Sequence, residues 1–259
     1  MSYETLEVER AGPVRRIWLD RPDRRNAISV TMLREIGDVF HALETDFEAR
    51  IAVLAGRGAS FCAGMDRRPD PPSQPVQERG EREQRWLGQL GRRACRAIEE
   101  CEIPVVARIQ GHAIGGGFCF ALACDFRIAT RDALFRVPEV ELGIPLTWGA
   151  VPRMIHEIGA ARARELLLRC NDVDGSTAEH WGLVHRAVEV AELDAEVERW
   201  VNDLLDKPEL AVHMTLTQLR AYARRASLGD VTESDGDLLA RASASPEMQR
   251  RFAMKPRKA

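Results

Sequence analysis

The hydrophobic positions in the first half of the chain change their period repeatedly, which predicts strands alternating with helices. Residues 5–20 predict two strands around the turn Ala11-Gly12-Pro13, with Val14, Ile17 and Leu19 on the buried side. Further short apolar runs, each of a length typical of a buried strand, lie at residues 51–55, 105–109 and 125–129.

Between these runs the apolar residues recur at helical spacing. Residues 31–46 predict an amphipathic helix capped by Ser29 or Thr31. Its buried face is expected to consist of Met32, Leu33, Ile36, Val39, Phe40 and Leu43. Two more helices are predicted, one over 81–100 and one over Phe118–Ala123. Strand–helix alternation of this kind favours an α/β fold with parallel strands.

From about residue 147 the pattern is mostly helical, with one strand-like segment at Leu183–Val188. The last part predicts helices alone, at residues 191–206, 208–226, 232–243 and 246–253. The chain is therefore expected to divide into a core at 1–190 and a helical region at 191–259. Because the helices of that region have apolar faces that need a partner, we expect them to support oligomerisation.

Composition and charge exclude several classes of protein. The 259 residues carry 37 basic and 40 acidic side chains, a net charge of −3, which argues against a general nucleic-acid binder. No apolar run reaches membrane-spanning length, and the N-terminus has no signal-peptide pattern. The six cysteines form no C-x-x-C pair, which favours reduced thiols in a cytoplasmic protein. His180 and His185 lack metal-ligand spacing, so no metal site is predicted.

Two glycine-containing transitions from strand to loop are candidates for chemistry. One is Phe61-Cys62-Ala63-Gly64-Met65-Asp66, and the other runs from Gln110 to Gly117, directly before a helix. Side by side, such turns supply two N–H groups to one oxygen, which is the geometry of an oxyanion hole. The alternative is tight packing of a helix on a strand. The dinucleotide, P-loop and G-x-S-x-G motifs are absent from the sequence.

Glu139 is a third candidate, because it lies among apolar residues and prolines in the segment Arg136–Pro145. Loss of hydration would raise the pKa of its carboxyl and suit it to acid–base catalysis. The alternative is a solvated glutamate in a surface turn.

Four motifs, in this order, resemble the crotonase superfamily, also called the enoyl-CoA hydratase/isomerase family. They are Arg21-Pro22-x-x-x-Asn26-Ala27-Ile28, Phe61-Cys62-Ala63-Gly64-Met65-Asp66, Gly115-Gly116-Gly117 with Cys124-Asp125-Phe126-Arg127-Ile128-Ala129, and Pro138-Glu139-x-x-Leu142-Gly143-Ile144. The resemblance covers about residues 5–185. It implies a spiral of ββα units, a helical C-terminal trimerisation region, and a homotrimer or a dimer of trimers.

The resemblance also implies an acyl-CoA thioester as substrate, so coenzyme A belongs to the substrate and no separate cofactor is expected. It makes the N–H groups of Met65 and Gly116 the oxyanion hole and Glu139 the catalytic residue. The residues expected to contact coenzyme A are Arg24, Arg25, Ala27, Ala63, Asp66, Arg67 and Lys255. The residues expected to shape the acyl pocket are Trp86, Cys119, Leu146 and Trp148, with the loop 67–80.

Departures from the family pattern bear on the reaction. Hydratases of the family use two glutamates, and the first of these falls at Cys119. A single base at Glu139 resembles the Δ3,Δ2-enoyl-CoA isomerases, whereas the aspartate of the dienoyl-CoA isomerases is replaced by Thr147. We therefore expect an isomerase. The alternatives are a hydratase in which Glu139 acts alone or with Glu141, other thioester chemistry, and a non-catalytic paralogue that binds CoA esters.

An RNA-binding helix is a further alternative, because arginines cluster after the proline-rich loop. They are Arg79, Arg82, Arg85, Arg92, Arg93 and Arg96. Glu78, Glu81 and Glu83 lie between them, which favours a solvated face held by salt bridges. Nucleic acid and membrane are accordingly not expected as partners.

Overall fold

The computed structural model of the protein describes residues 2–68, 79–226 and 235–253. Its centre is a sheet with the strand order β1-β2-β3-β4-β6-β9, in which β1 pairs antiparallel with β2 and the remaining pairs are parallel. These strands are β1 (Leu6–Ala11), β2 (Val14–Leu19), β3 (Ile51–Gly56), β4 (Val105–Ile109), β6 (Phe126–Thr130) and β9 (Arg186–Val188). The predicted α/β class with parallel strands is confirmed.

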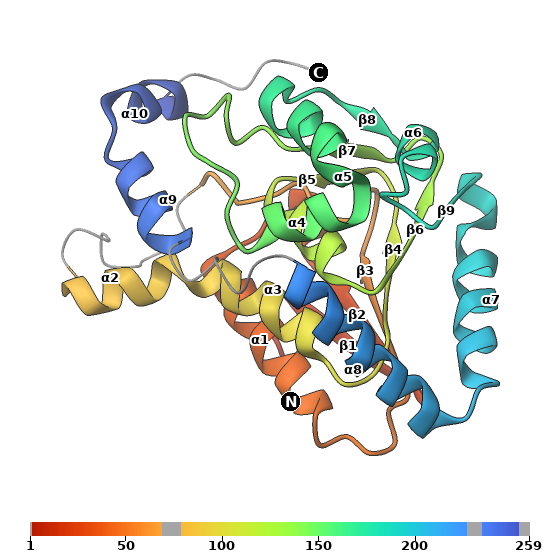
Figure 1. The fold of residues 1–259 in the computed structure, drawn as a ribbon. Coiled ribbons are helices and arrows are strands. Elements are labelled where there is room, and N and C mark those ends of the chain that lie inside the picture. Colours follow the sequence, from red (N-terminus) through yellow and green to blue (C-terminus); the bar gives the residue numbers. More distant parts are fainter. Residues whose placement is uncertain (1, 69–78, 227–234, 254–259) are drawn as a thin grey trace.

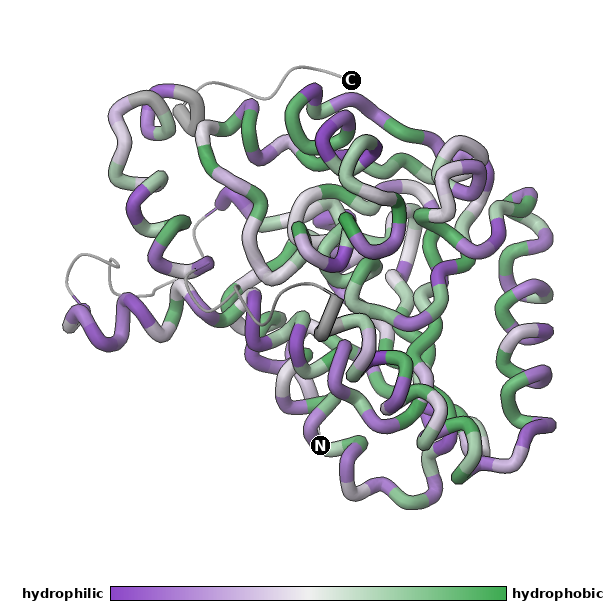
Figure 2. The backbone as a smooth tube through the Cα atoms, viewed as in Figure 1, coloured by the Kyte–Doolittle hydropathy of each residue, from purple (hydrophilic) through white to green (hydrophobic). Residues whose placement is uncertain are grey.

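Alternate residues of β3 face two separate apolar clusters. Ala52 and Leu54 pack toward the helices α1 (Val30–Leu43), α3 (Leu90–Glu100) and α4 (Gly116–Ala123). Ile51 and Val53 face the opposite way, toward α7 (Leu193–Leu205). Figure 1 shows α7 on the side of the sheet away from α1 and α3. In Figure 2, hydrophobic and hydrophilic stretches alternate along α7. The sheet is therefore buried on both faces, as a parallel sheet requires.

The first helix follows the sequence pattern closely. Ser29 is its N-cap, and the Ser29 hydroxyl accepts a hydrogen bond of 3.0 Å from the amide of Met32. All six apolar positions predicted for its inner face are buried. A capped helix with one continuous apolar stripe is specified locally, so this element needs little help from its surroundings.

A second, smaller sheet is present that the sequence pattern does not predict. It consists of β5 (His112–Ile114), β7 (Leu134–Arg136) and β8 (Val173–Asp174). Each strand has three residues or fewer, which is too short for a period of two to be visible in the sequence. This small sheet places the loop before α4 next to the segment that carries Glu139.

The predicted helix over 81–100 is wrong in one respect, because it is broken into α2 (Glu81–Gly88) and α3 at Gln89. The helix α9 (Asp235–Ser243) packs on this junction. A Cβ on Gly236 would lie 2.6 Å from the side-chain nitrogen of Gln89 and 3.1 Å from the carbonyl oxygen of Gly88. The break therefore accompanies a contact with residues almost 150 positions further along the chain.

The remaining elements are helical, and all but the first lie in the C-terminal half of the chain. They are η1 (Pro22–Arg24), α5 (Ala150–Arg169, interrupted at Gly159), α6 (Gly175–His180), η3 (Val190–Glu192), α8 (Glu209–Ala226) and α10 (Pro246–Ala253). The predicted C-terminal helices are confirmed within the described residues. All six cysteines are buried free thiols. None of the described helices is long and apolar enough to cross a membrane.

Candidate active site

The first glycine loop is fixed by a backbone pairing between Ile28 and Met65. The amide of Ile28 donates to the carbonyl oxygen of Gly64 at 2.8 Å, and the amide of Asp66 donates to that of Ile28 at 2.9 Å. In a parallel pairing of this kind, Ile28 bonds to the residues on either side of Met65, so the N–H of Met65 points away from Ile28. Gly64 allows this course because its φ is +88°.

The second glycine loop opens α4. The amide of Gly115 donates to the carbonyl oxygen of Arg136 at 3.0 Å, whereas the N–H of Gly116 belongs to the first helical turn and has no intrahelical acceptor. A Cβ on Gly64 would lie 2.8 Å from the carbonyl oxygen of Ile114 and 3.9 Å from the nitrogen of Gly116. The structure thus brings the two predicted donors, Met65 and Gly116, onto adjacent loops.

Glu139 lies in the turn after β7, and its carboxylate contacts the second glycine loop. A Cβ on Gly115 would be 2.7 Å from Glu139 Oε1. Among the described residues, no side chain or backbone group hydrogen-bonds the buried Oε2 atom. Burial raises the pKa of this carboxyl to about 7, against a smaller opposing effect of its own backbone amide. The pKa of this carboxyl therefore lies near neutral pH, which suits a catalytic base working there.

The two other candidate groups near Glu139 differ from it. Cys119 is 1% exposed in α4, and burial first, then the neighbouring Cys95, raise the pKa of its thiol well above the ordinary value. Glu141 accepts a 2.7 Å hydrogen bond from the guanidinium of Arg136. Cys119 is therefore a neutral thiol, and Glu141 already has a cationic partner.

Several arginines converge on Asp66, next to the first glycine loop. The guanidinium groups of Arg21 and Arg24 lie 3.0 and 2.9 Å from Asp66 Oδ2, and that of Arg68 lies 3.5 Å from Oδ1. Burial by itself would raise the pKa of Asp66, but the amide of Arg68 and the side chains of Arg24 and Arg21 lower it. The surplus of cations over this carboxylate leaves a positive patch.

Arg21 was missed as a site residue by the sequence analysis, although it stands in the first motif. Its side chain also donates to the carbonyl oxygen of Ala27. The amide of Ala63 donates to the carbonyl oxygen of Arg25 at 3.0 Å, and Arg67 is exposed nearby in the chain. The predicted group is therefore brought together, except that Lys255 lies outside the described residues.

The residues predicted to shape the acyl pocket differ in their burial. Trp148 contacts the second glycine loop, since a Cβ on Gly116 would lie 2.6 Å from its Cζ3 atom. Leu146 is buried two residues earlier. Trp86 is 39% exposed on α2, with Arg34 and Arg93 at 5.5 and 5.7 Å from its ring. Its place in an acyl pocket stays a prediction, as does that of the loop 67–80, of which residues 69–78 lie outside the described residues.

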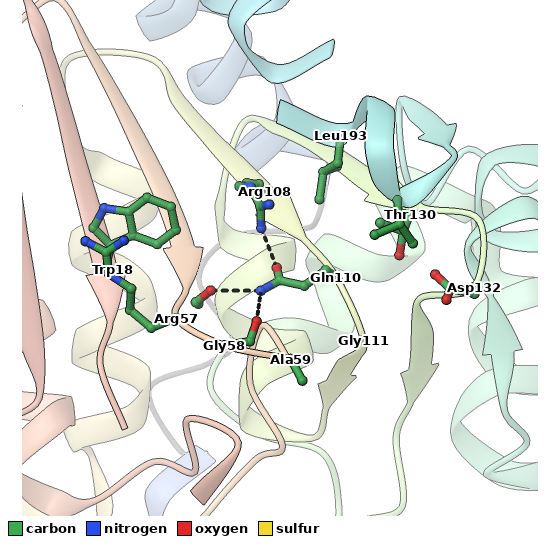
Figure 3. A pocket seen from close by; sticks show the side chains of 12 residues that line it. Trp18, Arg57, Gly58, Ala59, Arg108, Gln110, Gly111, Thr130, Asp132 and Leu193 are labelled. Carbon is green, nitrogen blue, oxygen red and sulfur yellow. Dashed lines mark hydrogen bonds between the residues drawn. The ribbon is translucent and has the colours of Figure 1, made fainter. Parts of the chain in front are cut away.

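A separate pocket of about 410 Å³ opens at the carboxyl ends of the central strands (Figure 3). It is lined by Trp18, Gly56, Arg57, Gly58, Ala59, Arg108, Gln110, Gly111, Thr130, Asp132, Val190 and Leu193. Its arginines already have partners: Arg57 is paired with Glu7 and Glu9, and Arg108 with Asp194 and Gln110. None of the predicted catalytic residues lines this pocket, and its charges give no reason to place the chemistry there.

At least three of the six arginines considered for RNA binding are paired with acidic groups. Arg79 binds Glu83 at 2.9 Å, Arg96 binds Glu100 at 2.9 Å, and Arg85 binds Asp237 of α9 at 3.2 Å. This agrees with the solvated, salt-bridged face that the sequence favours. Among the described residues, no three His, Cys, Asp or Glu side chains are grouped as metal ligands.

Comparison with known proteins identifies the family of the chain. The family model of enoyl-CoA hydratase/isomerase matches residues 9–255. The chain is 34% identical to crotonyl-CoA hydratase of Syntrophomonas wolfei, over 83% of this chain and 81% of the relative. It is 33% identical to the peroxisomal Delta(3,5)-Delta(2,4)-dienoyl-CoA isomerase of Arabidopsis thaliana, over 82% and 80% of the two chains.

Solved structures show the same fold. An enoyl-CoA hydratase from Mycobacterium avium subsp. paratuberculosis superposes with a TM-score of 0.86 at 26% identity, over 98% of this chain and 100% of that one. A putative enoyl-CoA hydratase from Thermobifida fusca in complex with acetoacetyl-CoA gives a TM-score of 0.77 at 28% identity, over 86% and 93%. The protein belongs to the enoyl-CoA hydratase/isomerase family of enzymes, with the crotonase fold.

Proposed function

We propose that the enzyme isomerises Δ3-enoyl-CoA thioesters to their Δ2 isomers, with Glu139 as the single base. In this reaction the Glu139 carboxylate takes a proton from C2. The C2–H electron pair then forms a C1–C2 double bond and puts the negative charge on the thioester oxygen, which gives a dienolate conjugated with the C3–C4 alkene. The protonated carboxyl then returns the proton to C4, so the double bond moves to C2–C3 with no other reactant. The observation that carries the proposal is the buried Oε2 atom of Glu139, which has no partner among the described residues.

The negative charge of the dienolate needs stabilisation on the thioester oxygen. We infer that the N–H groups of Met65 and Gly116 supply it, because they lie on adjacent loops and neither donates a hydrogen bond to a protein acceptor among the described residues. A preorganised donor of this kind is typically worth about 3 kcal/mol in the transition state. The pKa of Glu139, about 7, lets the same group remove and return the proton near neutral pH.

The positive patch around Asp66 supports an acyl-CoA substrate. Arg24 and Arg25 are proposed to bind the CoA phosphates, with Ala27, Ala63, Asp66 and Arg67 along the adenine and pantetheine. Guanidinium groups bind phosphate oxygens in pairs and keep their charge at any physiological pH. Replacing Arg24 by alanine is expected to raise KM and to leave kcat nearly unchanged, because its contact is equally strong in the ground and transition states.

Hydration of a 2-enoyl-CoA is the second candidate. It is favoured by relatives that are named hydratases, among them the crotonyl-CoA hydratase at 34% identity. Against it stands Cys119, a buried thiol at the position of the first glutamate of family hydratases. A neutral thiol does not activate water as a carboxylate does.

Assays with 3-hexenoyl-CoA and crotonyl-CoA separate the two reactions. The proposal expects turnover of the first and little hydration of the second, with Glu139→Gln abolishing turnover. Glu141→Gln is the matched control, because that residue lies in the same turn but is paired with Arg136. Hydration of crotonyl-CoA as the faster reaction would favour the second candidate. Other thioester products would indicate different chemistry, and binding without turnover a non-catalytic paralogue.

We also propose the family's trimer, or a dimer of trimers, as the oligomer. The helix α8 supports it with exposed apolar side chains, since Leu210, Met214 and Tyr222 are 70%, 58% and 70% exposed. Large exposed apolar groups on one element are typical of an interaction surface. Light scattering of the purified protein tests this, and a monomeric mass would overturn it.

A further inference from the structure

The indole ring of Trp148 fills the space between α3 and α4, beside the candidate oxyanion hole. A Cβ on Gly91 of α3 would lie only 1.8 Å from the Cε2 atom of the ring, on its pyrrole side. A Cβ on Gly116 of α4 would lie 2.6 and 2.7 Å from Cζ3 and Cη2, at the opposite edge. The ring thus spans the gap between two glycines, and both must lack a side chain for it to fit.

The ring is a fixed part of the wall. Trp148 is 8% exposed, and its φ of +62° is unusual for a residue with a bulky side chain. Two hydrogen bonds to the peptide group between Trp148 and Gly149 hold this conformation. The Nη1 atom of Arg153 donates to the carbonyl oxygen of Trp148 at 2.8 Å, and the amide of Gly149 donates to Asp235 Oδ2 at 2.6 Å.

A second aromatic ring supports the indole from α4. The ring of Phe120 lies 6.0 Å from that of Trp148, tilted by 30°. Arg153 is in turn bound to Glu99 of α3, so the loop, α3 and α5 are tied together. A strained backbone held by several independent contacts is typical of positions that shape a ligand site.

We propose that Trp148, seated on Gly91, limits the length of the acyl group, so that the enzyme acts on short-chain acyl-CoA thioesters. The inference rests on the proposed function, in which the thioester oxygen binds at the N–H of Gly116. The edge of the indole touches Gly116, and the carboxylate of Glu139 touches Gly115. We therefore expect the acyl carbons to extend from the oxyanion hole between Glu139 and the indole of Trp148. The indole occupies the space between α3 and α4 into which a longer acyl chain would extend.

Binding of saturated acyl-CoA thioesters tests the limit without requiring turnover. Isothermal titration with butyryl-CoA and octanoyl-CoA is expected to show tighter binding of butyryl-CoA to the unmodified protein. Trp148→Ala is expected to shift the ratio of the two dissociation constants toward octanoyl-CoA by about tenfold or more, the scale of discrimination in an apolar pocket. The ratio for Trp148→Phe should lie between those of the unmodified protein and Trp148→Ala.

Trp181→Ala is the matched control. Trp181 is partly buried after α6, where its ring stacks with Arg162 at 4.8 Å, away from the glycine loops. This variant should lose stability without altering the ratio of dissociation constants. An unchanged ratio in Trp148→Ala, or tighter binding of octanoyl-CoA by the unmodified protein, would overturn the limit while leaving the proposed function intact. No binding of any acyl-CoA would overturn both.

Gly91→Ala gives an independent test that does not require Trp148→Ala to fold. The added methyl group must displace the indole, so the variant should lower the melting temperature and change the ratio of dissociation constants. In the background of Trp148→Ala, or of Trp148→Leu if the alanine variant does not fold, Gly91→Ala should lower the melting temperature much less. Equal costs of Gly91→Ala in both backgrounds would show that the two residues do not interact and would overturn the inference.

Discussion

Gly115 and Glu139 are in direct contact, since a Cβ at residue 115 would lie 2.7 Å from Glu139 Oε1. The absence of a side chain at Gly115 therefore lets the carboxylate lie against the loop that presents the N–H of Gly116. The residue that Glu139 touches, Gly115, directly precedes the proposed donor Gly116, so the contact holds the base close to that N–H group.

Gly115→Ala is expected to lower kcat/KM by about a hundredfold, because the methyl group pushes the base away from its working position. The matched control is Gly12→Ala. Gly12 has a φ of +58°, close to the +53° of Gly115, but a Cβ there would meet no atom within 4 Å. Both variants should lose stability, whereas only Gly115→Ala should lose activity. Equal activity of the two would contradict the role of this contact.

The pH dependence of kcat/KM should report the ionisation of Glu139. A general base must be deprotonated, so the rate should rise with pH and level off above a pKa of about 7. Glu141→Gln should keep this profile. A rate that is constant from about pH 5.5 to 8.5 would mean that no group with this pKa acts as the base.

The same carboxyl should make the folded state less stable at high pH. Its pKa is raised from 4.5 to about 7 by burial, so folding becomes less favourable as pH rises from 4.5 and the full cost is present above 7. The cost is up to about 3 kcal/mol. Glu139→Gln should therefore be more stable than the unmodified protein at pH 8 and similar to it at pH 4, in urea unfolding at both values. The opposite order would contradict the raised pKa.

Arg220 should anchor α8 to the core. Its Nη2 atom lies 2.8 and 2.9 Å from the two carboxylate oxygens of Asp125, whose pKa is raised by burial against the opposing effect of Arg220. Arg220→Met leaves a buried carboxylate without its cation, and a loss of about 3–5 kcal/mol is expected. The double variant with Asp125→Asn should recover part of this loss. Chemical denaturation measures the free energy of unfolding of both variants. An Arg220→Met variant as stable as the unmodified protein would exclude an anchoring role.

Arg199→Met is the control for that experiment. Arg199 lies on the surface of α7, where it is paired with Glu196 one turn earlier. The Arg199 side chain is half exposed, and Glu196 keeps a hydrogen bond from Trp200 when Arg199 is removed, so Arg199→Met should lower the unfolding midpoint far less than Arg220→Met.

Elements whose pattern is local follow from the amino-acid sequence alone. The helical stripe from Met32 to Leu43, the cap at Ser29 and the apolar run of β3 are specified by residues close in the chain, and burial of an apolar face decides their position. The resemblance placed Met65, Gly116 and Glu139 in one site before any contact between them was known. Each belongs to a short motif at a turn, where few backbone conformations are possible.

Contacts between distant segments of the chain depend on how the whole molecule folds. The break at Gln89 accompanies packing by Gly236, and Arg21 reaches Asp66 across a turn and a loop. The contact between Trp148 and Gly91 joins residues 57 positions apart, and the sequence around either residue does not predict it. The raised pKa of Glu139 has the same origin, because desolvation depends on every segment that surrounds the carboxyl and not on the residues beside it in the chain.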